Sequence, residues 1–192
     1  MSKIIVNQIE SSDGTTDVLN SLSAVNVAGA GMGQVLQVVS TFSNTHVAIN
    51  TSTPQNAGLS ATLTPSSTSS KILVTFNGMT GNSSNDSSCG ISLYRHLNYP
   101  SGSAGFVGIG DNGSNNSQVE VGTASFTKDS LPGGAGLTFL DSPNTTDQVA
   151  YTIYLVSRSG SYTSYLNRTG GNANATYSYS GGSSITLMEI SG

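Results

Sequence analysis

Apolar residues recur at every second position along several stretches of this chain. The alternation is clearest at Ile72, Val74 and Phe76, at Cys89, Ile91 and Leu93, and at Val149, Tyr151, Ile153 and Leu155. Side chains two residues apart lie on the same face of a pleated strand, so the pattern predicts strands with one face buried in a core. The stretch 148–157 also carries Tyr154 and Val156 on its second face, which predicts a central strand or one packed against another subunit.

Turn-forming residues separate these stretches at short intervals. Pro, Gly, Asn, Asp and Ser gather at 64–70, 81–86 and 111–116, and these residue types favour reverse turns. The best candidate for an amphipathic helix, 17–27, is rich in Ser, Asn and Val, and we predict no helix. The pattern therefore predicts an all-β fold, an antiparallel β-sandwich of the jelly-roll kind. We expect strands near 34–42, 45–50, 58–64, 70–77, 88–95, 105–110, 118–126, 135–141, 148–157, 162–168, 174–179 and 183–190.

The first 33 residues differ from the rest of the chain in their residue pattern. A strand-like run, 3–10, is followed by an Asp-Gly turn, and the segment ends in the Gly-rich stretch 28–33. Such a segment cannot build a core. We therefore predict two parts, an extended N-terminal arm (1–33) and a β-sandwich head domain (34–192). The arm is expected to be held by a sister subunit or a docking partner, through the apolar anchoring residues Ile4, Ile5, Val6 and Ile9.

Composition narrows the classes of partner. Hydrophobic residues make up 35% of the chain and charged residues 8%, so the core is marginal for one chain and oligomerisation would stabilise it. The six Lys and Arg are scattered, and the sequence pI of about 4.8 argues against nucleic-acid binding. No apolar run approaches the roughly 20 residues that cross a bilayer. We expect neither nucleic-acid binding nor membrane insertion.

The N-terminus lacks the long apolar region of a secretory leader. The chain has a single cysteine, so it forms no internal disulfide. Cys89 lies in an alternating apolar strand, where a buried structural thiol is expected. These observations favour synthesis in a reducing cytosol, with release by another route such as assembly into a virion.

Motifs with catalytic or metal chemistry are weak. Residues 108–113 match G-x-G-x-x-G, but they run into a loop rather than a helix inside a βαβ unit. Asp141 and Asp147 flank what reads as a hairpin loop, where Asp commonly bonds its own backbone. His46 and His96 are interpreted as surface or interface residues, and the loop 111–116 fails the EF-hand pattern. We predict no catalytic site, cofactor or resident metal.

Several segments resemble known proteins. They are the opening SKIIVNQIESSDG at 2–14, GQVLQVV at 33–39, LSATLTPSSTSSKILVTF at 59–76, FLDSP at 139–143, YLNR at 165–168 and the ending SITLMEI at 184–190. Together they resemble fibre-type virion proteins of marine and freshwater bacteriophages, including cyanophages. The head pattern is also similar, more loosely, to trimeric jelly rolls of the TNF and C1q type. The resemblance implies a homotrimer on the virion surface, for which we expect interface residues Tyr154, Val156, Leu187 and Met188.

The leading functional hypothesis is a tail-fibre or receptor-binding protein that mediates host attachment. It would be assembled in the host cytoplasm, contact other virion proteins through its arm, and bind a host cell-surface glycan through loops on the rigid head. A capsid decoration or head-fibre protein that stabilises the capsid is the first alternative, and a glycan-degrading tail enzyme is a weaker one. The expected partner-binding residues are Asn82, Asn85, Asp86, Asn98, Tyr99, Asp111, Asn112 and Asn115.

Overall fold

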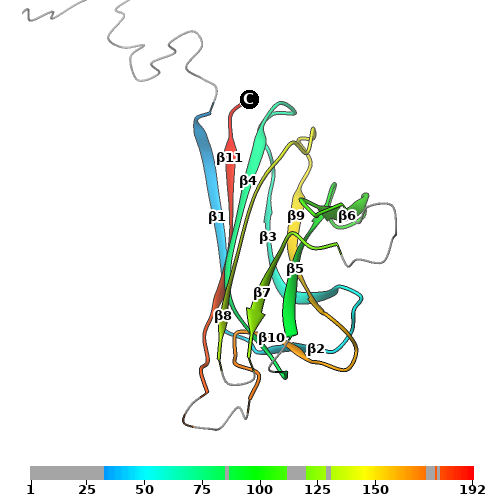
Figure 1. Cartoon of the computed structure of the whole chain (residues 1–192). Coiled ribbons are helices and arrows are strands. Elements are labelled where there is room, and N and C mark those ends of the chain that lie inside the picture. Colours follow the sequence, from blue (N-terminus) through cyan, green and yellow to red (C-terminus); the bar gives the residue numbers. More distant parts are fainter. Residues whose placement is uncertain (1–32, 85–86, 112–119, 129–130, 172–175, 177) are drawn as a thin grey trace, which may run out of the picture.

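The computed structural model describes residues 33–84, 87–111, 120–128, 131–171, 176 and 178–192. These residues form two antiparallel sheets that face one another (Figure 1). The prediction of an all-β antiparallel sandwich is confirmed. The first sheet contains β1 (Val35–Ser43), β2 (Val47–Ile49), β4 (Lys71–Asn82), β8 (Gly133–Asp141), β10 (Ser164–Leu166) and β11 (Ser183–Ile190). The second contains β3 (Gln55–Leu63), β5 (Ser87–His96), β6 (Ala104–Val107), β7 (Thr123–Thr127) and β9 (Val149–Ser157).

The long strands pair in a nested order. Without the short strands β2, β6 and β10, the first strand pairs with the last, β1 with β11, and the pairing then moves inward: β3 with β9, β4 with β8, and β5 with β7. All four pairs are antiparallel, and successive pairs alternate between the two sheets. A long hairpin folded over into two layers gives this nesting.

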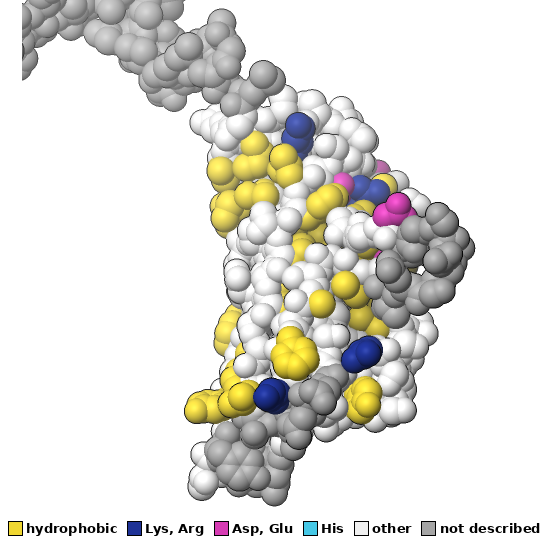
Figure 2. Space-filling model, viewed as in Figure 1, with side chains coloured by type: hydrophobic (Ala, Val, Ile, Leu, Met, Phe, Trp, Pro, Cys, Tyr) yellow, Lys and Arg dark blue, Asp and Glu magenta, His cyan; other side chains and the backbone are white. Residues whose placement is uncertain are grey.

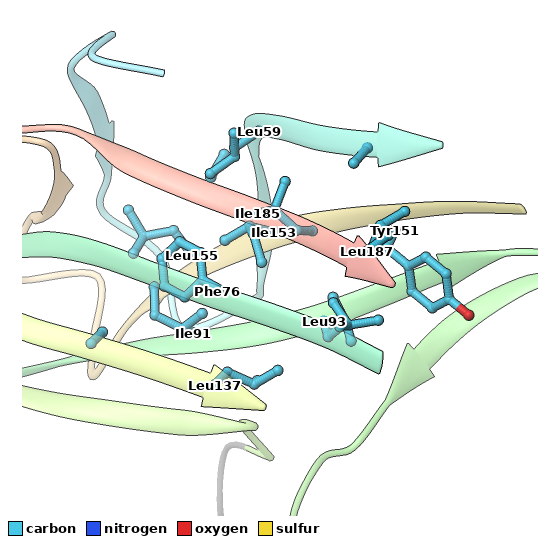
Figure 3. Close-up of a cluster of buried hydrophobic side chains, with 14 of the residues drawn as sticks. Leu59, Phe76, Ile91, Leu93, Leu137, Tyr151, Ile153, Leu155, Ile185 and Leu187 are labelled. Carbon is cyan, nitrogen blue, oxygen red and sulfur yellow. The ribbon is translucent and has the colours of Figure 1, made fainter. Parts of the chain in front are cut away.

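The alternating apolar residues fill the space between the sheets. All ten residues of the three clearest stretches are at most 1% exposed, and they belong to one continuous core (Figure 3). Because their side chains point inward from both sheets, the alternation identified the core-facing positions correctly. Strand β9 lies between β3 and β5, so it is central, as its two apolar faces predicted.

Strand ends differ from the expected ranges where pairing partners change. Strand β4 extends past the expected end at 77, because β10 takes over from β11 as its partner over Thr80 to Asn82. Strand β3 starts earlier than expected, at Gln55, and contains a bulge where Gly58 adopts a φ of 71°. That left-handed conformation favours glycine. Half of the expected strand at 174–179 falls outside the described residues, and the described positions 176, 178 and 179 are not in a strand. The expected arm up to 32 and the candidate helix at 17–27 also fall outside the described residues.

The two ends of the sandwich are distinct. The first described residue pairs with the C-terminal segment, since the Gly33 amide donates to the Ser191 carbonyl at 2.9 Å. We name this end the arm end (Figure 1). The starts of β1, β4 and β9 and the ends of β5, β8 and β11 lie there. The opposite end, the far end, contains Asn82, Ser87, Ser157 and Ser183.

A buried carboxylate fastens the arm end. Glu189 on β11 is fully buried and accepts hydrogen bonds from Gln37 Nε2 of β1 at 2.6 Å and from the Ser66 amide and hydroxyl at 2.7 and 2.6 Å. Burial alone would raise its pKa, but these hydrogen bonds together outweigh burial and lower the pKa from 4.5 to about 2. Ionised Glu189 thus ties β1 and the β3–β4 loop to β11.

We predict that Glu189 makes stability depend on acidity. Because its folded-state pKa lies below the ordinary value, the stabilisation is complete above about pH 4.5 and is lost as the pH falls toward 2. Glu189→Gln should lower the free energy of unfolding at pH 7 by about 1–3 kcal/mol, and the difference from wild type should shrink at pH 3. Urea titrations at both pH values measure this, with the exposed Asp147→Asn as control. An unchanged difference at pH 3 would contradict the assignment.

Candidate functional site

The predicted partner-binding residues do not share one surface. Asn98 and Tyr99 are exposed at the arm end, and Asp111 is exposed in the β6–β7 connection. Asn82 lies at the far end and is fully buried, with its side-chain amide donating to Ser164 Oγ at 3.2 Å. The expectation that Asn82 sits in an exposed loop is therefore corrected: strand pairing continues through this position. Asn85, Asp86, Asn112 and Asn115 lie outside the described residues.

The predicted interface residues also do not lie on one surface. Leu187 is fully buried in the core, and Val156 is 2% exposed, so neither side chain is available to a second subunit, which corrects both. Val156 lies on the outer side of its sheet but is covered within the chain. A Cβ added at Gly90 would lie 2.5 Å from Val156 and 2.7 Å from Val121, so Val121 packs over this spot. Met188 and Tyr154 are half-buried on outer faces of different sheets. The anchoring residues Ile4, Ile5, Val6 and Ile9 lie outside the described residues.

The carboxylate of Asp141 has a structural role. It is 6% exposed and accepts two hydrogen bonds from Arg95 Nη1, at 2.8 and 2.9 Å, and one from the Tyr151 hydroxyl at 2.6 Å. Burial and then the hydrogen bond to Asp141 raise the pKa of Tyr151. The three residues come from β5, β8 and β9, so they join the two sheets across the core.

Other chemically reactive side chains are engaged in similar local contacts. His46 Nε2 lies 2.6 Å from Ser180 Oγ, and His96 Nε2 lies 3.0 Å from the Gly102 carbonyl. Burial raises the pKa of the Cys89 thiol to about 12, against a smaller opposing effect of its hydrogen bond with Ser164, so this thiol is unreactive at neutral pH. Within the described ranges, no group of three or more His, Cys, Asp or Glu side chains is placed to bind a metal.

The outer face of the first sheet is the most prominent candidate interaction surface. Strand register aligns Val38 of β1, Met188 of β11, Leu73 of β4 and Leu140 of β8 in one row. Val38 and Leu140 are 55% and 50% exposed. Exposed Val35 and Leu36 and half-buried Ile190 adjoin the row toward the arm end. Figure 2 shows the hydrophobic side chains gathered over this end of β1, β11 and β4. An apolar patch continuous over four strands is typical of a protein contact.

The part of this face toward the far end is neutral. The next row toward the far end carries four hydroxyl groups, those of Ser40, Thr186, Thr75 and Thr138. Beyond it, Phe42, Asn77 and Met79 border a shallow groove of about 470 Å³ whose wall and floor include Gly133, Gly134 and Gly182. Phe42 is 69% exposed. Among the outward-facing strand positions of β1, β11, β4 and β8, the charged residue is Lys71, at the arm-end start of β4.

Sequence reasoning missed most of this outer face. It named Met188 but not its row neighbours Val38, Leu73 and Leu140. A usable signal was present, since Ile72-Leu73-Val74, Phe139-Leu140 and Leu187-Met188 place apolar residues at adjacent positions of a strand. Adjacent residues point to opposite faces, so each such pair has one apolar side chain on the outside.

Comparison with known proteins gives no family. No protein-family model matches the chain, and no curated protein matches it. The described residues contain no helix long and apolar enough to cross a membrane.

The different placement of Leu187 and Met188 gives a prediction. Leu187→Ala leaves a cavity in the core and should lower the free energy of unfolding by about 2–5 kcal/mol. Met188→Ala, on the outer face, should cost the separate chain less than about 1 kcal/mol. Denaturant titrations at low protein concentration compare the two variants. A greater loss for Met188→Ala would mean that the faces are assigned the wrong way round.

Proposed function

We propose that this chain is a homotrimeric surface protein of a bacteriophage virion, a fibre-type receptor-binding protein that mediates attachment to the host. The supporting sequence evidence is the resemblance of its segments to fibre-type virion proteins. The supporting structural evidence is a sandwich whose first sheet has an outer face of mainly apolar and hydroxyl side chains, with Lys71 as the charged residue among its outward-facing strand positions. We propose no enzymatic activity.

The observation that carries the proposal is the set of apolar and hydroxyl rows on the outer face of β1, β11, β4 and β8, which contain no charged residue. Its apolar and hydroxyl rows can meet the same rows of another copy without opposing like charges, although the whole chain carries a formal net charge of −4. Because Val38, Met188, Leu73 and Leu140 already lie side by side, the face buries apolar area on contact without rearrangement.

The two edges of this face differ in shape. Bulky Phe42 stands on the β1 edge, whereas Gly136 occupies the corresponding row position on β8, and a Cβ added at the nearby Gly134 would meet nothing within 4 Å. A protrusion at one edge and bare backbone at the other fit a head-to-tail contact, in which the β1 edge of one copy packs on the β8 side of the next. Head-to-tail contacts do not give twofold dimers; they close into rings when the rotation between neighbouring copies closes, and the proposed trimer is such a ring.

The placement of the ends supports attachment through the arm. The arm joins the sandwich at Gly33, at the arm end, so a trimer held to a particle by its arms presents its far end and its sides to the surroundings. Three copies per trimer and many trimers per particle would convert weak individual contacts into strong attachment.

A charge introduced into the outer face of the first sheet tests whether this face forms the trimer contact. Val38→Glu should place three carboxylates in the contact and convert the trimer to monomer, because buried like charges repel and lose hydration. Sedimentation velocity measures the mass, and circular dichroism checks the fold. Phe126→Glu, at a 65% exposed position on the other sheet, is the matched control and should stay trimeric. A monomeric wild-type chain, or trimeric Val38→Glu, would overturn the proposed face.

Location on the particle tests the function. Gold-labelled antibodies against the head domain should mark the tail of phage particles that carry this sequence, and the purified protein should slow adsorption of those particles to host cells. Dense label over the capsid, with no effect on adsorption, would favour the decoration alternative instead. Particles without label would contradict a virion protein of either kind.

A further inference from the structure

Three aromatic rings cluster on the outer face of the second sheet. The ring centroids of Tyr94 and Phe106 are 5.0 Å apart, those of Tyr94 and Tyr154 are 4.8 Å apart, and those of Phe106 and Tyr154 are 5.2 Å apart. Phe106 stands nearly perpendicular to both tyrosines, at 77° and 89°. The cluster is fixed by strand pairing, because Tyr94 lies opposite Phe106 in the β5–β6 ladder and Tyr154 opposite Ser92 in the β5–β9 ladder.

The cluster extends toward the arm end. His96 lies two positions beyond Tyr94 on the same strand face, and its ring lies 5.3 Å from that of Tyr99 in an edge-to-face arrangement. Phe106 is 36% exposed and Tyr99 is 45% exposed, while Tyr94, Tyr154 and His96 are half-buried. Aromatic surface is therefore available from the centre of the sheet to its arm end. We name these five residues the aromatic strip.

Neutral hydrogen-bonding groups border the strip. Register places Thr152 of β9 and Ser60 of β3 in the same row as Tyr94 and Phe106, and Asn56 in the row of Tyr154. Ser60 and Asn56 are exposed. Burial and then the nearby Tyr94 raise the pKa of Tyr154, so its phenol remains a hydrogen-bond donor at neutral pH.

Fixed charge is absent from the outward-facing strand positions around the strip. Arg95 lies between Tyr94 and His96 in sequence, but its guanidinium faces the opposite side of β5 and pairs with Asp141 at 2.8 Å. The corresponding positions of β3, β9 and β6 carry Ser, Thr, Asn, Ala, Gly, Val and aromatic residues. A single-stranded nucleic acid would need cations beside the rings, so the surface does not fit one.

We propose that the aromatic strip is a binding site for a neutral saccharide chain. The apolar C–H face of a pyranose ring can pack against an aromatic face, and its hydroxyls can exchange hydrogen bonds with neutral hydroxyl and amide side chains at the border. The strip offers both features in register on a rigid sheet. This inference deepens the attachment role proposed above, since it names the site and the chemical class of the receptor. Saccharide binding by the purified protein is nevertheless independent of any particle.

The test is native affinity electrophoresis of the full chain through gels containing, one at a time, dextran, starch, galactomannan, xyloglucan and a β-1,3-glucan. We expect retardation that grows with the concentration of at least one of these polysaccharides. Phe106→Ser should weaken the apparent affinity at least tenfold, while Tyr154→Phe, which keeps the ring, should retain most of it. Phe126→Ser, an exposed aromatic on the same sheet but outside the strip, is the matched control and should bind like wild type.

Three outcomes would overturn the proposal. They are mobility unchanged by all five neutral polysaccharides, equal retardation of Phe106→Ser and wild type, and retardation by dextran sulfate but by none of the neutral polymers. Thermal unfolding of each variant verifies the fold. Because binding is measured without phage, its failure would leave the virion assignment intact, and absence of the chain from particles would leave the saccharide site intact.

Discussion

The fold depends on one apolar layer between two sheets. Strands with alternating side chains supply that layer from both sides, and the nested pairing brings the first strand beside the last and the central ones beside one another. The layer is continuous although the chain as a whole is weakly hydrophobic, because the apolar residues are concentrated at inward-facing positions such as Ile153, Leu155 and Leu187. The outer faces follow from this arrangement, because packing of the inward-facing side chains fixes the backbone of each strand and therefore the positions of its outward-facing residues.

Polar clusters complete the sandwich where the apolar layer ends. At the arm end, Glu189 holds β1 and the β3–β4 loop, and Asp141 links Arg95 to Tyr151 across the sheets. At the far end, Asn167 adopts a φ of 67° and donates from Nδ2 to the carbonyls of Ser43 and Thr45. Each cluster satisfies buried polar atoms and joins segments distant in sequence, so these residues stabilise the fold.

The sequence predicted the inner face of the sandwich far better than its surfaces. Alternation at Ile72, Val74 and Phe76 needs no knowledge of neighbours, because it follows from the pleat of one strand. Rows such as Val38, Met188, Leu73 and Leu140 depend on the register of four strands, which no local pattern specifies. The same limit explains the wrong prediction for Asn82. The composition of the segment 81–86 suggested a loop, but pairing with β10 makes Asn82 part of β4 and buries it. The aromatic strip likewise joins residues that are separated in sequence, with Tyr94 and Tyr154 brought together by the β5–β9 ladder.

The two outer faces have different chemistry, and the difference suggests different tasks. The first sheet presents aliphatic side chains, hydroxyls and bare backbone over a wide area, which suits contact with another protein surface of the same kind. The second presents aromatic rings bordered by hydroxyl and amide groups, which suits a small polar ligand with apolar patches. Because the sandwich places these faces on opposite sides, association through the first leaves the second accessible on every copy. In the proposed trimer, three equivalent copies of the proposed saccharide site would lie around the rim, where weak binding at each site gains from the others.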